Sequence, residues 1–542
     1  MRKLHAALAV VALAVVALGI SSCGGDSEGQ EGGTLTGTYA SFPDFLDPAL
    51  SYTAEGWTAM YNTYLPLLTY KHADGEEGSE VVPALAESLP EISADGKTYS
   101  LKLREGLKYS DGTPVKASDF PATIERLFKL NSPGSPFYTG IVGAEEFAET
   151  KKGGIPGIEA DDKTGEITIE LTAPSGTFTN ELALLFAALV PADTAAKNTT
   201  ADPLPATGPY EITATEPGRS WSYARNPQWT KTNGDLIPDL PDGHVDKIEM
   251  KVVRNSSTQV NEIERDQTDW MQSLVPADLY SQVKDKYEGS QFRVEHPINI
   301  YYFWMNTTEP PFDDVKVRQA VNYAIDSAAL ERIYAGSLSA AHQILPEGMP
   351  GHEPFDLYPH DMAKAKALFK EANPSDREIT VWTDNESPNN EAGAYYNDVL
   401  SQLGFETTLK TLNADVYFTT IGNLSTPDLD TGWTNWFQDY PHPNGFFAPL
   451  LSGEGIAPTF NTNNSQTDVP KLNEKITKLG EEQLGPDQEA EYAELDREFM
   501  ELAPWAPYGT ITVSTFVSTA VDLDEVVFNP TMGQDLTSFQ LE

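Results

Sequence analysis

The chain has a single cysteine, Cys23, among its 542 residues, and this scarcity excludes several kinds of chemistry. A disulfide bridge and a thiolate metal cluster each need more than one thiol. Cys23 lies at the end of the N-terminal apolar run, where we expect its thiol to be modified. Cysteine catalysis is therefore also excluded from the mature protein.

Basic residues are also scarce, with 36 Lys and Arg against 81 Asp and Glu, and the formal net charge is −45. Nucleic acid is excluded as a partner, because contacts to phosphates are made by Lys and Arg. The charge favours solubility and attracts cationic solutes, but it identifies no ligand. Hydrophobic residues make up 40% and aromatic residues 10%, which is enough for large cores and argues against disorder. The length predicts more than one domain.

Long hydrophobic runs are absent after the first twenty residues. Arg2 and Lys3 precede 15 apolar residues at 6–20, and two serines lead to Cys23. This is the pattern of a secretory signal, and the run is shorter than the roughly 20 residues of a spanning helix. Residues 20–23 resemble the bacterial lipobox, in which cleavage before the cysteine is followed by acylation.

We therefore expect a lipoprotein signal peptide at 1–22, a lipid anchor on Cys23 and a flexible glycine-rich tether at 23–33. More than one acyl chain would give a stable membrane anchor. The alternative is ordinary secretion with an unmodified cysteine.

Alternating patterns predict strands in the first half of the chain. Residues 98–103 and 166–171 each follow a turn signal, so each is expected to be one arm of a hairpin. Ser118 is a candidate N-cap for a helix to about Leu130, with Pro121 tolerated in its first turn. Further strands are predicted at 34–40, 209–215, 247–253 and 299–305.

The second half alternates between helix and strand. A helical pattern begins at Asp313, and a second helix is expected to start at Asp326 and to end at Gly336. A β-α-β alternation follows and predicts an α/β domain with a mixed or parallel sheet. Its segments are helix 361–372, strand 378–383, helix 391–403 and strand 405–411, and helix 487–502 precedes strands within 508–518.

Several segments together resemble the family 5 bacterial extracellular solute-binding proteins, the group of the dipeptide, oligopeptide and nickel receptors. Their number, order and spacing carry the resemblance, which extends from about residue 34 to 515. The segments are 83–88 (PALAES), 101–119 (LKLREGLKYSDGTPVKASD), 207–210 (TGPY), 225–227 (RNP), 311–326 (PFDDVKVRQAVNYAID), 346–351 (PEGMPG) and 363–368 (AKAKAL).

This resemblance implies an α/β protein with the type II periplasmic-binding fold, in which two hinged lobes carry an extra inserted domain. Two chain crossings between domains I and III would form the hinge, and closure would bury the ligand. The implied domains are domain I (34–77, 206–300 and 509–542), domain II as an insertion (78–205) and domain III (301–508).

The resemblance also indicates a ligand site in residues 432–441, which are similar to the ligand-facing strand of the peptide receptors. In those receptors an aspartate before a tyrosine pairs with the terminal ammonium of the peptide, and Asp439 matches it. A buried ammonium needs such a partner. Backbone groups of 435–437 would pair with an extended peptide. The implied ligand-binding residues are Asp439, Asn435, Trp436, Phe437 and Trp433, with Ser51, Tyr52 and Thr53 on the opposite wall.

Other interpretations of the same residues are open. Asp439 could cap a turn, and Trp433 and Trp436 could fill the core. His442 stands where the peptide receptors often have an acidic residue, and it could face solvent or adjust the pocket.

The function implied is the substrate-binding subunit of an ABC importer that captures a short peptide and delivers it to membrane permease subunits. A monomer without catalysis, metal or cofactor is expected. Alternatives within the family are an oligosaccharide, nickel or a metal chelate, or haem as ligand, and the protein could instead be a ligand-sensing lipoprotein. No two of the eight histidines are spaced i, i+4, although His352 and His360 lie eight apart.

A secreted serine acylase is the alternative from the enzyme class. Residues 281–284 (SQVK) and 163–165 (KTG) are similar to its motifs, but they occur in reverse order and without a Ser-Asp-Asn element. The chain also has no Gly-x-Ser-x-Gly elbow and no HExxH helix.

Overall fold

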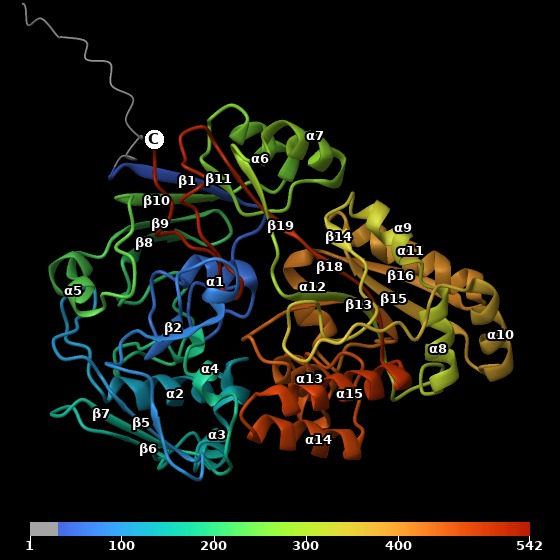
Figure 1. The fold of residues 1–542 in the computed structure, drawn as a ribbon, viewed down its shortest axis with the longest axis horizontal. Coiled ribbons are helices and arrows are strands. Elements are labelled where there is room, and N and C mark those ends of the chain that lie inside the picture. The colour runs from blue at the N-terminus through green and yellow to red at the C-terminus, as the bar shows by residue number, and fades with distance from the viewer. Residues whose placement is uncertain (1–30) are drawn as a thin grey trace, which may run out of the picture.

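The structure is a computed structural model that describes residues 31–542 (Figure 1). The predicted signal peptide (1–22), the lipid anchor at Cys23 and most of the tether lie outside the described residues. Within 31–542, no helix combines the length and the apolar character needed to span a bilayer.

Seven strands from distant parts of the chain form the first sheet. Their order is β12-β19-β11-β1-β10-β9-β8, and β1 runs parallel to both of its neighbours. In β10 the alternate residues Ile248 and Met250 are buried, as expected for a strand with one face on a core. The predicted strands at 34–40, 209–215 and 247–253 are confirmed to within one residue. The seven strands are β1 (Thr34–Tyr39), β8 (Tyr210–Glu216), β9 (Ser220–Arg225), β10 (Lys247–Val252), β11 (Trp270–Met271), β12 (Phe292–Glu295) and β19 (Val513–Val517).

A smaller antiparallel sheet lies in the segment between β1 and β8. Its order is β4-β5-β7-β6, and both predicted hairpin arms pair with a preceding strand as expected. α2 (Asp119–Leu130) begins directly after Ser118, which confirms the predicted N-cap position and helix end. The Ser118 side chain makes no capping hydrogen bond, and its hydroxyl donates to Asp162 Oδ2 at 3.0 Å. The strands are β4 (Glu91–Ile92), β5 (Thr98–Lys102), β6 (Ile158–Ala160) and β7 (Glu166–Glu170), and the pair β2 (Leu68–Tyr70) and β3 (Val81–Pro83) precedes them.

The third sheet has the order β14-β18-β13-β17-β15-β16. β15 and β16 run parallel and are joined by α11 (Asn389–Leu403), which confirms the predicted β-α-β unit. Every residue of β13 is buried, because β13 lies in the middle of this sheet with helices on its faces (Figure 1). The strands are β13 (Asn299–Met305), β14 (Leu338–Ser339), β15 (Glu378–Asp384), β16 (Glu406–Leu412), β17 (Thr431–Phe437) and β18 (Trp505–Ile511).

Helices cover the third sheet. Asp326 caps α9 by accepting from the Ala328 N–H at 3.1 Å, as predicted. α9 nevertheless ends at Ile333, three residues before Gly336, because the chain already turns at Ala335 with a φ of 51°. The helices are α8 (Val315–Ala324), α9 (Ser327–Ile333), α10 (Met362–Ala372), α12 (Ala414–Ile421), α13 (Asn444–Leu451), α14 (Pro470–Glu481) and α15 (Pro486–Leu502).

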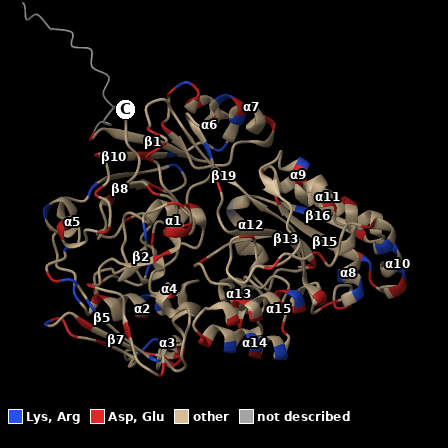
Figure 2. Cartoon of the chain, viewed as in Figure 1, with Lys and Arg blue, Asp and Glu red and all other residues tan. Residues whose placement is uncertain are grey.

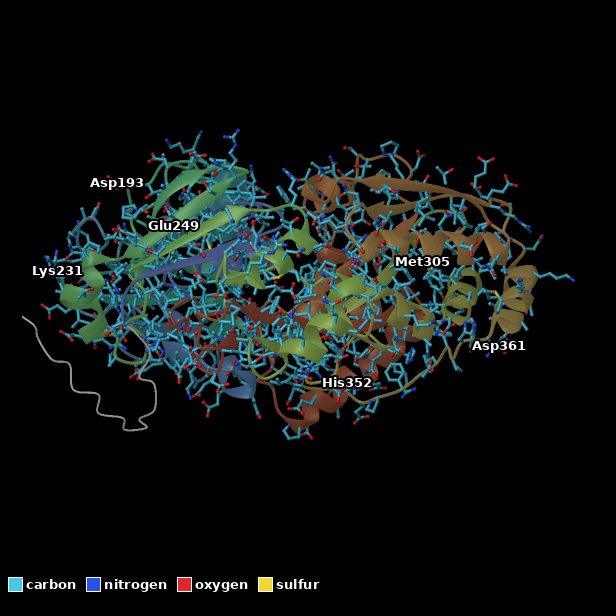
Figure 3. The ribbon with its side chains drawn as sticks, turned by 90° about the horizontal axis from the view of Figure 1, so that it is seen from above. Asp193, Lys231, Glu249, Met305, His352 and Asp361 are labelled. Atoms are coloured by element: carbon cyan, nitrogen blue, oxygen red, sulfur yellow. The ribbon has the colours of Figure 1, made fainter. Side chains whose placement is uncertain are left out.

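The molecule has two lobes, each with its own large hydrophobic core. The first lobe contains the seven-stranded and four-stranded sheets, and the second contains the six-stranded sheet. The chain passes between them at 296–298, from β12 to β13, and at Thr512, from β18 to β19. Figure 3 shows Lys231 and Glu249 on one lobe and Met305 and Asp361 on the other. The domain bounds given above stay a prediction.

Candidate functional site: the cleft between the lobes

Aromatic side chains bring the two lobes into contact. Tyr52, just before α1 (Ala54–Met60) in the first lobe, has its ring centroid 5.8 Å from that of Trp436 on β17 in the second. Its ring also lies 5.3 Å from Phe186 and 6.3 Å from Phe137. Tyr440 from the second lobe packs into the core of the first. The two lobes are therefore closed on each other at this point.

Asp439 lies at the centre of this contact. β17 ends at Phe437, and Pro441 follows shortly after, so the chain leaves the sheet at Asp439. The side chain is 4% exposed, and burial raises its pKa to about 8, although the neighbouring Tyr52 hydroxyl lowers it. Its Oδ2 finds no hydrogen-bond partner within residues 31–542. A buried carboxylate in this state is unfavourable until a cation or donor pairs with it.

The edge of β17 next to Asp439 is partly open. On one side β17 pairs with β13 along its whole length, whereas on the other β15 pairs only with Thr431 and Gly432. Gln438 donates its N–H to Ile298 O on the β13 side, and Trp433 O accepts from the Tyr417 hydroxyl. Because backbone direction alternates along a strand, the N–H and C=O groups of residues 435 and 437 point to the open side.

The opposite wall is built around Asp44. Its carboxylate accepts from the Ser51 hydroxyl at 2.6 Å, the Tyr52 N–H at 2.7 Å and the Thr53 hydroxyl at 3.0 Å. Thr53 also accepts from the Gly56 N–H and so caps α1. The hydroxyls of Ser51 and Thr53 are thus used to shape the wall, and Tyr52 presents its ring to the other lobe.

Several carboxylates accompany Asp44 in the cleft. Burial raises the pKa of Glu55, and the charges of Asp44 and of Glu386 from the second lobe raise it further. Burial likewise raises the pKa of Asp384, at the end of β15, to about 7. Sequence reasoning did not single out Asp44, Asp384 or Glu386. A signal existed for Asp384, because ligands of α/β sheets often bind beyond the carboxyl ends of strands.

The remaining predicted residues lie on or behind β17. Trp433 is buried between Tyr301 and Tyr417, whose ring centroids lie 6.0 and 5.5 Å away, so it belongs to the core of the second lobe. Trp436 and Phe437 are half-buried, and the Trp436 indole donates to Gly445 O at 3.1 Å. Asn435, also half-buried, pairs across the sheet with Tyr301.

His442 does not face solvent, so that alternative is wrong. It is 2% exposed, and burial lowers its pKa to about 4, which keeps the imidazole neutral at pH 7. Its Nδ1 accepts from the Asn444 N–H at 3.1 Å, so the proton is on Nε2.

The two histidines considered for metal binding are held by backbone carbonyls. His352 Nδ1 lies 2.8 Å from Leu345 O, and His360 Nδ1 lies 3.2 Å from Ile325 O. His352 is labelled in Figure 3. Across residues 31–542, no three His, Cys, Asp or Glu side chains are grouped to hold a metal ion.

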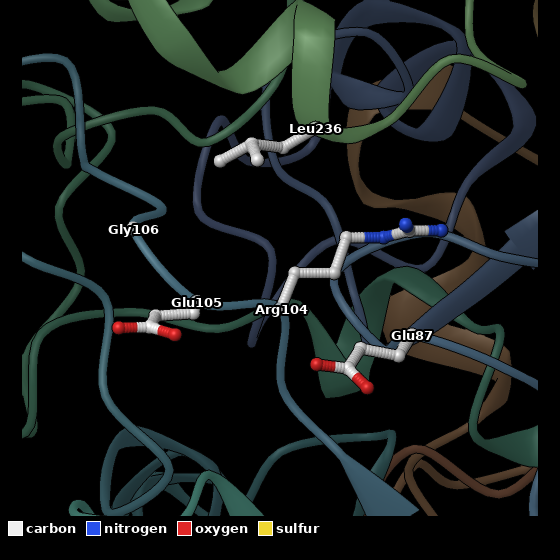
Figure 4. Close-up of a pocket in the computed structure, with 5 residues that line it drawn as sticks. All are labelled: Glu87, Arg104, Glu105, Gly106 and Leu236. Carbon is white, nitrogen blue, oxygen red and sulfur yellow. The ribbon is translucent and has the colours of Figure 1, made fainter.

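Two hollows lie away from the cleft. One of about 660 Å³ is lined by Glu87, Arg104, Glu105, Gly106 and Leu236 in the first lobe (Figure 4). The other, of about 300 Å³, includes His342, Asp356 and His360 in the second lobe. Neither hollow is lined by Asp439 or Tyr52. We therefore place the candidate site where the two lobes meet, around Asp439, Tyr52 and the neighbouring carboxylates.

Two hinged lobes with a polar cleft between them define a solute-binding protein, and known proteins agree. The model of the bacterial extracellular solute-binding proteins, family 5 Middle, matches residues 80–458. This chain is 26% identical to Heme-binding protein A of Haemophilus influenzae over 497 residues, 86% of this chain and 85% of that protein. It is 27% identical to the Dipeptide-binding protein of Escherichia coli over 403 residues, 69% of this chain and 71% of that protein.

Solved structures show the same fold. Clavulanic acid biosynthesis oligopeptide binding protein 2 matches with a TM-score of 0.83 and 25% identity, covering 94% of this chain and 96% of that one. The chain belongs to the family 5 bacterial extracellular solute-binding proteins and has the type II periplasmic-binding fold.

The arrangement of the lobes is the closed one. The murein tripeptide binding protein MppA of Escherichia coli matches with a TM-score of 0.80 and 19% identity, covering 95% of this chain and 99% of that one. Its unliganded open form matches with a TM-score of 0.67, 21% identity and the same coverage. These matches show the shared fold, and the ring contact between Tyr52 and Trp436 shows that the two lobes of this protein lie against each other.

Proposed function

We propose that this protein binds a short peptide with a free amino terminus and delivers it to the permease of an ABC importer. The observation that carries the proposal is Asp439, a buried carboxylate with one oxygen unpaired among the described residues. An ammonium group supplies both the charge and the hydrogen bonds that this carboxylate lacks. The open edge of β17 supports an extended peptide, because backbone pairing of this kind tolerates many side chains.

The ligands named for similar proteins support a peptide as the ligand of this protein, but they leave other ligands open. Relatives include a dipeptide-binding protein and a heme-binding protein. Haem is the second candidate, on the specific ground of that relative. The cleft residues described here favour the peptide, because the acidic groups suit a cationic end better than the propionates of haem.

Binding would couple to closure of the lobes. A ligand shifts the equilibrium only by its differential affinity for the closed form. Burying Asp439 without a cation disfavours the closed form, and an ammonium removes this penalty. We further propose that the protein acts as a monomer without catalysis, and that a lipid on Cys23 holds it at the outer face of the cell membrane.

Native mass spectrometry of the full chain as it comes from cells tests these proposals. We expect an intact mass that indicates cleavage before Cys23 plus acyl chains, and adducts that differ by amino-acid residue masses.

Asp439→Ala should weaken the binding of a free-amine peptide by about 1–3 kcal/mol, the cost of leaving a buried charged group unpaired. A discrete non-peptide adduct would overturn the peptide proposal, and a mass without acylation would overturn the lipid anchor.

A further inference from the structure

We propose that the site takes peptides of at most about four residues, because Tyr417 of α12 closes the open edge of β17 beyond Asn435. This inference rests on the proposed peptide-binding function and names the length class of the ligand. It concerns the end of the edge that lies away from Asp439.

The strands β15 and β17 separate next to Tyr417. They pair only at Thr431 and Gly432, the first two residues of β17. Just beyond this point the Tyr417 hydroxyl connects the two strands, because it donates to Trp433 O at 2.7 Å and lies 3.1 Å from Trp382 O. The Trp433 carbonyl on the open side is therefore already in use, and a peptide cannot pair with it.

Tyr417 is held firmly in this position. Its side chain is fully buried, and its ring stacks on that of Trp433 with the centroids 5.5 Å apart. The start of α12 is fixed as well, because the Ala414 N–H donates to Oδ1 of Asn385, the residue that directly follows β15, at 3.1 Å. A peptide that reached Trp433 would have to displace a packed helix, which close packing opposes.

The register of β17 relates this closure to a peptide length. β17 ends at Phe437, so the first peptide residue that can pair with its edge lies opposite Phe437, with its ammonium directed toward Asp439. From there the peptide runs antiparallel to β17, and paired residues recur at every second position. Its third residue would pair with Asn435, and a fifth would need Trp433. A peptide of about three to four residues fills the edge, whereas a longer one would keep buried polar groups unpaired.

The overall charge of the protein is a separate influence on peptide binding. The net charge is −45, and acidic residues are spread over both lobes (Figure 2). This general field attracts basic side chains, and a longer peptide can carry more of them. The charge therefore favours long peptides and cannot produce a limit on length. Peptides with uncharged side chains remove its influence from the test.

The test is native mass spectrometry of the full-length chain in detergent, freed of bound ligand and mixed with four random peptide libraries. The libraries hold tri-, tetra-, penta- and hexapeptides with free amino termini and uncharged side chains, in equimolar amounts. Random sequences average out side-chain preference, and the mass of each adduct gives the length of the bound peptide. We expect tri- and tetrapeptides to occupy at least about ten times more protein than penta- and hexapeptides, because unpaired buried polar groups weaken binding.

Two variants locate the cause of this limit. Tyr417→Ala should open the edge and reduce the ratio of short to long peptides to about one. Tyr396 is the matched control: it is equally buried in the same lobe, and its hydroxyl lies 2.9 Å from Thr431 Oγ1, where β17 is already paired with β15. Tyr396→Ala should leave the preference for short peptides unchanged. Circular dichroism checks that each variant is folded.

The outcomes separate the two proposals. Binding of none of the libraries would overturn peptide binding itself. Equal occupancy by all four lengths in the wild type, or a preference for the long peptides, would overturn the length inference alone, and this result needs no variant. A preference for short peptides that persists in Tyr417→Ala, or that Tyr396→Ala also removes, would likewise overturn it.

Discussion

At the scale of single residues, the buried carboxyl of Asp439 shows what the proposed binding site would cost in stability. Burial raises its pKa to about 8, so at neutral pH the closed protein holds a proton there that an exposed aspartate would release. On the proposed function such a group persists because ligand binding needs it, although the closed form without ligand would be more stable without it. Glu181 in the first lobe, where burial raises the pKa to about 7, is a second buried acid near Tyr440.

Asp439→Asn is therefore expected to favour the closed form of the ligand-free protein while it weakens peptide binding. The raised pKa means that the contribution of Asp439 to the closed form is fully present below the pKa of an exposed aspartate, about 3.9, and is lost as the pH rises through about 8. Closure of the ligand-free variant should thus match that of the wild type at pH 4 and be more favourable at pH 8 by about 1–3 kcal/mol. The radius of gyration of the two ligand-free proteins at both pH values measures this. A larger radius of gyration for the variant than for the wild type at pH 8 would contradict the explanation.

At the scale of elements, a second contact between the lobes lies far from Asp439 in the sequence. The Gly176 N–H, in the loop before α4 (Phe178–Glu181), donates to Gly480 O on α14 at 2.8 Å. Gln483 donates to Ser175 O at 3.3 Å. A Cβ atom on Gly176 would lie 1.9 Å from Glu482 O, so glycine is required for this close approach. The contact joins the two lobes in the arrangement that the structure shows.

Gly176→Ala should consequently hinder closure without disturbing either lobe. We expect at least about tenfold weaker ligand binding, which corresponds to a penalty of about 1.4 kcal/mol on the closed form. Gly140→Ala is the matched control, because a Cβ there has no atom within 4 Å. Calorimetry gives the affinities, and thermal unfolding without ligand should give the same midpoint for both variants. Equal affinities of the two variants would show that this contact has no part in closure.

At the scale of the whole molecule, the two links at 296–298 and at Thr512 allow the lobes to move as units. Each lobe keeps its own core, whereas few side chains such as Tyr440 are shared. Hinge motion about a few residues between rigid lobes is a common way to enclose a ligand.

Small-angle X-ray scattering of the ligand-free and ligand-bound protein tests this motion. The closed structure should fit the ligand-bound data, and the ligand-free protein should have the larger radius of gyration. A compact chain of this length has a radius of gyration of about 24 Å, which the bound form should approach. Identical curves with and without peptide would argue against closure on binding.

Much of the fold was predictable because it rests on local patterns. The alternation of hydrophobic and polar residues predicted the bounds of β1, β5, β7, β8, β10 and β13 to within one residue. The capping residue Asp326 predicted the start of α9. Ser118 holds the N-cap position of α2, but its side chain does not cap the helix, because its backbone is already helical, with φ −66° and ψ −12°. The resemblance predicted Asp439, Trp436 and Tyr52 as site residues, and the structure places Tyr52 beside each of the other two.

The amino-acid sequence by itself determined the class of protein and the order of most elements, and it proposed Asp439 as the first candidate for the site. These features depend on neighbours within a few positions or on motifs that can be recognised in order. The acidic wall of Asp44, Glu55 and Glu386, the burial of His442 and the close approach at Gly176 were decided only by the tertiary structure. Burial and the meeting of charges from two lobes depend on contacts between residues hundreds of positions apart, which no local pattern encodes.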